Sequence, residues 1–198
     1  MPSFGESALP LVSCEASHSR FQRCRVIRFL GLLLLSLSLA GCVSKYRVDN
    51  YEKPSVHLNR TSSFYVTLPA DGQYGDTAYP GSGAAAAHAV RAALLTHVDK
   101  VVTGAVANES LESALAQAKQ QGLSHVFQTS ILNWEDRATE WSGIPDKITL
   151  KLAVYNAQSG EMVSSTITSA SSKWGTFGGD HPQDLLPVPT KTFADQLF

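Results

Sequence analysis

Residues 147–155, KITLKLAVY, place an apolar aliphatic side chain at every second position. The apolar side chains of one face are those of Ile148, Leu150, Leu152 and Val154. A period of two is typical of a strand in a sheet with one buried face and one wet face. The turn residues Gln158-Ser159-Gly160 and the more polar segment 161–169 then predict a hairpin whose second strand lies at the edge of the sheet.

Strand and helix patterns alternate upstream of this hairpin. Strands are predicted at 62–69, 100–107 and 123–141, helices at 84–98 and between an Asn108 cap and Gly122, and a loop at 71–83. A short helix is predicted from about Thr190 to the C-terminus. The sequence therefore predicts an α+β fold of order β-α-β-α-β-β-β-α, with helices packed on a mixed sheet and a C-terminal β-meander.

A short apolar run before the first predicted strand ends in Leu39-Ala40-Gly41-Cys42, which resembles a bacterial lipobox. In a lipobox the cysteine sulfur receives a diacylglyceryl group and the cysteine becomes the first residue after cleavage. The run 29–40 has the length of a signal-peptide core, roughly 7–15 residues, rather than the ~20 of a membrane span. Four arginines precede it, so we expect residues 1–41 to be a signal peptide and Cys42 to be lipidated.

The length of this signal leaves two readings open. A signal of 41 residues exceeds the usual ~15–30, whereas a start at Val26 would give 16. Residues 1–25 are therefore either a misassigned N-terminal extension or a long N-terminal region.

The chain that would follow the signal contains Cys42 as its one cysteine, since Cys14 and Cys24 precede the cleavage point. We therefore expect no disulfide framework and no cofactor besides the covalent lipid. The formal net charge of residues 42–198, −3, argues against a nucleic-acid partner. Residues 42–60 lack periodicity and predict a flexible tether spanning about 25 Å, followed by a single periplasmic domain at 61–198.

Location follows from the lipid anchor. Val43 is not the aspartate that often retains lipoproteins in the inner membrane, so by resemblance to that sorting rule we expect the inner leaflet of the outer membrane, facing the periplasm. Retention in the inner membrane stays open.

Two segments concentrate residues that could carry function. WEDRATEW (134–141) supplies Trp134, Glu135, Arg137 and Trp141, and GGDHPQD (178–184) supplies Asp180 and His181. Trp and Arg contribute much of the energy of binding surfaces, so these six residues are the candidate partner-binding site. The alternatives are a cross-strand ion pair for the first segment and a glycine-hinged loop for the second.

The strand and helix order resembles the periplasmic domain shared by the amino-terminal part of TolB and by curli secretion lipoproteins. CVSKYRVDNYEKPSV, NWEDRATEWSG and KWGTFGGDHPQDLLP together resemble a proteobacterial envelope lipoprotein family catalogued as a domain of unknown function. This resemblance implies a class and a location, and it carries over no catalytic residue.

These observations predict a membrane-anchored envelope lipoprotein that binds an unknown periplasmic protein or cell-wall partner and is not an enzyme. Two alternatives remain: an oligomeric secretion or structural lipoprotein, and an envelope hydrolase that uses His181 with Asp180 or Glu135.

Replacing Cys42 with serine tests the anchor. We expect Cys42→Ser to abolish incorporation of labelled palmitate, because the hydroxyl cannot take the place of the lipid-accepting sulfur. Cys24→Ser is the matched control and should label like the wild type. Palmitate incorporation into the Cys42→Ser variant would refute the predicted site.

Overall fold

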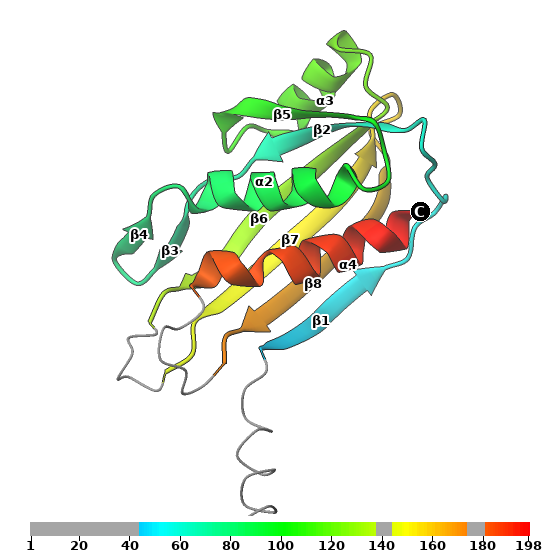
Figure 1. Cartoon of the computed structure of the whole chain (residues 1–198). Helices are drawn as coiled ribbons and strands as arrows, with labels where there is room; N and C mark the ends of the chain where they lie inside the picture. The colour runs from blue at the N-terminus through cyan, green and yellow to red at the C-terminus, as the bar shows by residue number, and fades with distance from the viewer. Residues whose placement is uncertain (1–43, 138–143, 174–180) are drawn as a thin grey trace, which may run out of the picture. The chain divides into compact units, whose positions relative to one another are not determined.

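Strand β7 (Lys147–Asn156) lies within a six-stranded sheet of order β1-β8-β7-β6-β2-β5 (Figure 1). The computed structural model describes residues 44–137, 144–173 and 181–198. The other strands are β1 (Lys45–Glu52), β2 (Ser63–Leu68), β5 (Lys100–Ala107), β6 (His125–Glu135) and β8 (Met162–Ser171). β2 runs parallel to β5 and β6, and the remaining pairs are antiparallel. The sheet is therefore mixed.

Chain direction decides which face each helix covers. α2 (Ser82–Leu94) joins β2 to β5, and α3 (Leu111–Gln120) joins β5 back to β6 on the other side of β2. Because crossovers between parallel strands are right-handed and these two move in opposite directions, the helices must lie on opposite faces. α4 (Pro187–Leu197) lies beside α2 across β7 and β8 (Figure 1).

Each face has its own hydrophobic core. The larger core joins α2 and α4 to the sheet and includes Phe64, Phe127, Leu150, Leu152 and Phe193. The smaller core lies under α3 and includes Tyr65, Ala114, Ala118, Leu123 and Val126. Small alanine side chains on α2 and α3 let both helices lie close to the strands.

The predicted α+β class and element order are confirmed, and α4 begins three residues before the predicted Thr190. The predicted cap of α3 was wrong. Ser110 is the cap and its Oγ accepts from the Ser113 N–H at 3.2 Å, while Asn108 adopts the left-handed conformation with φ 55°. The predicted loop at 71–83 also contains a small hairpin, β3 (Gly72–Tyr74) and β4 (Thr77–Tyr79).

Part of the segment expected to be a flexible tether is strand β1, which pairs antiparallel with β8. Every residue of β1 is exposed. Because β1 has no buried face, its apolar residues do not alternate, and the sequence did not reveal a strand. Side chains of β8 hold it instead: Ser164 Oγ donates to the Glu52 carbonyl at 2.6 Å, and Thr166 Oγ1 donates to the Asn50 carbonyl at 2.8 Å.

The same pairing corrects the predicted position of β8. The polar sequence of β8 predicted an edge strand, but β8 lies between β7 and β1. Its hydroxyl groups are satisfied by the neighbouring backbone rather than by water, as when Thr168 Oγ1 donates to the Arg47 carbonyl at 3.0 Å.

In the described parts of the chain, no helix has both the length and the apolar character needed to span a bilayer.

The β3–β4 hairpin is fixed against the end of β6. A Cβ on Gly72 would lie 2.5 Å from Trp134 Cβ and 2.9 Å from Trp134 Cγ, closer than carbon atoms can pack. The start of α2 is tied to the same hairpin, because Ser82 Oγ accepts from the Gly72 N–H at 2.7 Å. Asp71 Oδ1 accepts from the Gly83 N–H at 2.8 Å and places a carboxylate at the helix N-terminus, where the helix dipole favours it.

We expect Gly72→Ala to lower the free energy of unfolding by about 1–3 kcal/mol, because the added methyl must displace the buried Trp134. Urea denaturation followed by tryptophan fluorescence measures the change. Thr77→Ala, at an exposed position of the same hairpin, is the control and should stay within about 0.5 kcal/mol of the wild type. An unchanged free energy of unfolding in Gly72→Ala would show that Gly72 is not in close contact with Trp134.

Candidate functional site

Trp134, predicted to be part of a binding surface, belongs to the core. It is 2% exposed near the end of β6, and the β3–β4 hairpin packs against it. Its position in the strand explains this, since Trp134 pairs with Ile148 on the face that packs under α2 and α4. Trp134 therefore supports the neighbouring residues and offers little of its own surface to a partner.

Glu135 and Arg137 form the polar part of the site. Arg137 Nη1 donates to the Tyr74 hydroxyl at 2.9 Å and lies 3.4 Å from Glu135 Oε2, and its guanidinium carbon lies 5.2 Å from the centre of the Tyr74 ring. Asn133 Nδ2 donates to the other Glu135 oxygen at 3.0 Å. This ion pair joins two residues of one segment, whereas the predicted alternative was a pair across strands. The Arg137–Tyr74 hydrogen bond ties the end of β6 to β3.

Tyr74 and Asp146 belong to this site although no sequence pattern pointed to either. Asp146 is buried, and one of its carboxylate oxygens accepts from the Arg137 backbone N–H. Its own N–H donates to Ser172 Oγ at 2.9 Å, and its carbonyl accepts from the Ser172 N–H at 2.9 Å. Asp146 thus joins the end of β6, the start of β7 and the end of β8. The dipeptide Pro145-Asp146 before an alternating strand indicated a turn, but not this role.

The two predicted segments meet in space through described residues. His181 Nδ1 lies 3.9 Å from Asp136 Oδ1, at the point where the 3-10 turn η1 (Pro182–Leu185) begins. Asp184 Oδ2 accepts from the His181 backbone N–H at 2.9 Å, which fixes the start of that turn. Trp141 and Asp180, the other two predicted site residues, lie outside the described residues.

In the described residues, the His181 ring has no hydrogen bond to Asp136 or Glu135. The His181 side chain is 61% exposed, and its 3.9 Å separation from Asp136 is longer than a hydrogen bond. Of the two predicted partners of His181, Glu135 bonds to Asn133 and Arg137, and Asp180 lies outside the described residues. Within the described ranges, no three His, Cys, Asp or Glu residues are placed so that they could hold a metal ion.

Two grooves border the site. One, of about 440 Å³, lies between the β4–α2 junction and the site, with Trp134, Asp136 and Gln183 in its wall. The other, of about 500 Å³, is largely apolar and runs between α2 and α4, lined by Ala85, Ala89, Ala92, Leu186 and Pro187.

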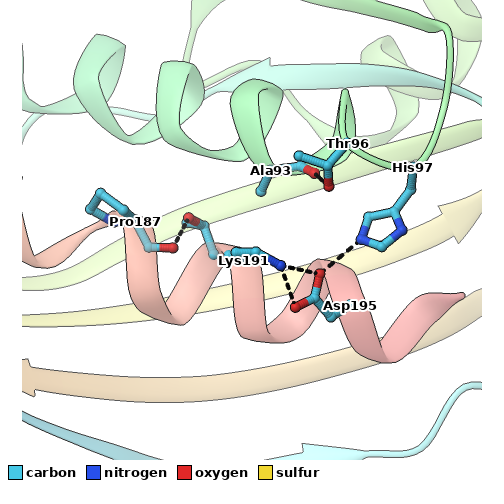
Figure 2. Close-up of polar contacts among 7 residues, drawn as sticks. Ala93, Thr96, His97, Pro187, Lys191 and Asp195 are labelled. Atoms are coloured by element: carbon cyan, nitrogen blue, oxygen red, sulfur yellow. Dashed lines mark hydrogen bonds and ion pairs between the residues drawn. The ribbon is translucent and has the colours of Figure 1, made fainter.

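Polar contacts join α4 to the loop after α2 (Figure 2). Asp195 Oδ1 lies 2.8 Å from Lys191 Nζ and 2.8 Å from His97 Nε2, and the His97 ring stacks on Phe198 with centroids 4.5 Å apart. Hydrogen bonds from Lys191 and then from His97 lower the pKa of the Asp195 carboxyl. This contact links α4 to the loop after α2.

Two further groups have shifted pKa values for structural reasons. Burial, and then the neighbouring Glu109, raise the pKa of the Tyr65 phenol to about 12. Burial lowers the pKa of His125, whose ring stacks on Phe64 and whose Nδ1 lies 2.8 Å from Ser124 Oγ. Both groups lie under or beside the core on β2 and β6, so their shifts follow from packing.

Known structures share this fold. PelC from Paraburkholderia phytofirmans, described as a dodecamer, is similar with a TM-score of 0.60 and 14% identity, over 78% of this chain and 97% of that chain. A point variant of the same dodecamer gives 0.58 and 14%, over 77% and 98%. Lipoprotein GNA1162 from Neisseria meningitidis gives 0.41 and 16%, over 69% and 97%. At 14% identity the likeness to PelC extends to the fold alone.

Among curated proteins, no sequence matches this chain. A family model described as a domain of unknown function, DUF4823, matches residues 56–197, which span β2 to α4 and include every described residue of the candidate site. The expected membership in a family of this kind is confirmed, and the chain belongs to the DUF4823 family.

Proposed function

We propose that this protein is a lipid-anchored component of the bacterial envelope that works by binding other protein chains in an assembly and not by catalysis. The observation that carries the proposal is the fold likeness to PelC, which covers nearly all of a chain described as a dodecamer. The lipobox at 39–42 supplies the anchor.

Two features of the sheet support assembly. β1 and β5 are the outer strands of the six-stranded sheet, and each has one side without a neighbouring strand in the described residues. Outer strands present unpaired N–H and C=O groups that can pair with another chain. All eight residues of β1 are exposed, and Val106 on β5 is exposed as well.

The candidate site supports binding in a second way. Arg137, Tyr74 and His181 lie at one end of the sheet on a supported framework, because Trp134 and Asp146 beneath them are buried. Arginine and tyrosine on rigid supports are the residues that contribute most to protein interfaces.

We expect the lipidated protein to be an oligomer in detergent, since its fold and open sheet edges are compatible with association. Light scattering after size-exclusion chromatography measures the protein mass free of the detergent contribution. Cys42→Ser lacking the signal peptide is the matched sample, because it separates association through the domain from association through lipid. A monomer in both samples would overturn the assembly proposal.

We expect Arg137→Ala to weaken capture of the protein partner about tenfold or more, the loss seen when a hot-spot arginine of an interface is truncated. Crosslinking in intact envelopes, followed by quantitative mass spectrometry, compares the variant with wild type. Arg91→Ala, which removes an exposed arginine on α2, is the matched control and should leave capture unchanged. Equal recovery of the same partners by wild type and Arg137→Ala would exclude this surface.

A further inference from the structure

We propose that one end of the sheet is a membrane-contacting surface that rests against anionic lipid headgroups. This end, called the proximal end below, comprises the start of β1, the end of β6, the start of β7 and the end of β8. The inference rests on the proposed lipidation of Cys42, and it adds the orientation of the domain and the lipid chemistry that the domain meets.

The segment between Cys42 and β1 is too short to let the domain stand far from the membrane. β1 begins at Lys45, three residues after Cys42. Three fully extended residues span at most about 10 Å. A lipid on Cys42 would therefore hold the start of β1 within about 10 Å of the attachment point, well short of the tether of about 25 Å that a coil over the whole segment would give.

The register of the sheet places the ends of three other strands beside the start of β1. Lys45 lies opposite Ser171, Ser171 lies opposite Lys147, and Lys147 lies opposite Glu135. The four strands therefore share one end, as Figure 1 shows for β1, β7 and β8. An anchor that holds Lys45 at the bilayer brings the other three strand ends toward the same surface, with the Arg137 site beside it at the end of β6.

The attachment of β1 to β8 makes this orientation stable. Seven residues of β1 are in register with β8, and three hydroxyl groups of β8 add bonds to β1 carbonyls. The anchor is thus joined to the sheet itself and not to a free segment.

The side chains at the proximal end suit a headgroup region. Lys45 and Lys147 are exposed, and Ile144 is 41% exposed beside them. Among the described carboxylates at the end of β6 and the start of β7, Asp146 is buried, Glu135 is 12% exposed and bonded to Arg137, and Asp136 lies next to His181. Exposed ammonium groups on flexible stems can reach lipid phosphates while an apolar neighbour meets the interface.

Fluorescence energy transfer on vesicles tests the orientation. The purified lipidated protein is placed in vesicles of phosphatidylethanolamine and phosphatidylglycerol that carry an acceptor dye on the headgroups. Lipidation occupies Cys42, so single-cysteine variants take a donor dye at one chosen position. Ser171→Cys and Thr149→Cys label the proximal end and keep both lysines, and Ser159→Cys and Gln158→Cys label the turn at the far end of β7.

We expect transfer from the two proximal positions to exceed transfer from the two distal positions severalfold, because the ten residues of β7 separate the ends by about 30 Å. Inserting twelve Gly and Ser residues between Val43 and Ser44 should remove this difference. In vesicles of phosphatidylcholine alone, the excess should shrink, since the anionic partner of the lysines is gone.

Equal transfer from both ends in the uninserted protein, with palmitate labelling intact, would overturn the inference and leave the proposed lipid anchor standing. An excess that is the same in phosphatidylcholine would overturn the contact with anionic headgroups. Loss of palmitate labelling in the wild type would instead overturn the proposed function. Two labels at each end ensure that one poorly folded variant does not decide the result.

Discussion

Burial of one face of β7 is the constraint on which the other elements depend. Ile148, Leu150, Leu152 and Val154 are at most 1% exposed, and burying an aliphatic side chain of this size is worth about 1.5–3 kcal/mol. β6 and β8 flank this strand, while α4 and α2 cover its apolar face. Covering that face requires α4 to return across the sheet after β8, and it requires α2 to carry alanines so that two helices fit side by side.

Helices and strands that bury one apolar face could be predicted from the sequence, because the spacing of their own apolar residues marks that face. The alternation of β7 and the spacing of Val90 and Leu94 on α2 each described a face that the structure buries. β1 could not be predicted in this way, because β8 supplies the hydroxyl groups that hold it and all of its residues stay in water. The polar sequence of β8 was misread for the same reason: its threonines bond to a strand that the pattern had not revealed.

The site was predictable as a concentration of residue types but not as an arrangement. Glu135 and Arg137 pair within one segment instead of across strands, and Tyr74 reaches Arg137 from 63 residues away. Trp134 was indistinguishable in sequence from an interface tryptophan, and only its place on the inward face of β6 makes it a core residue. The approach of Asp136 to His181 depends on where α4 and η1 lie, which is a property of the packed sheet. The outcome is a polar surface whose main groups bond to one another.

The antiparallel pairing of β1 with β8 also has a mechanical consequence. Hydrogen bonds between antiparallel strands lie perpendicular to the strand axis. A pull on the chain at residue 42, directed away from the domain along β1, therefore loads the paired residues of β1 together in shear, because Lys45 is the end that receives the force. Peeling the strand sideways would break the same bonds one after another and would need less force. The pairing of β1 with β8 thus resists a pull along the strand axis. A force applied to the chain at residue 42 acts in this direction when it points away from the domain along β1.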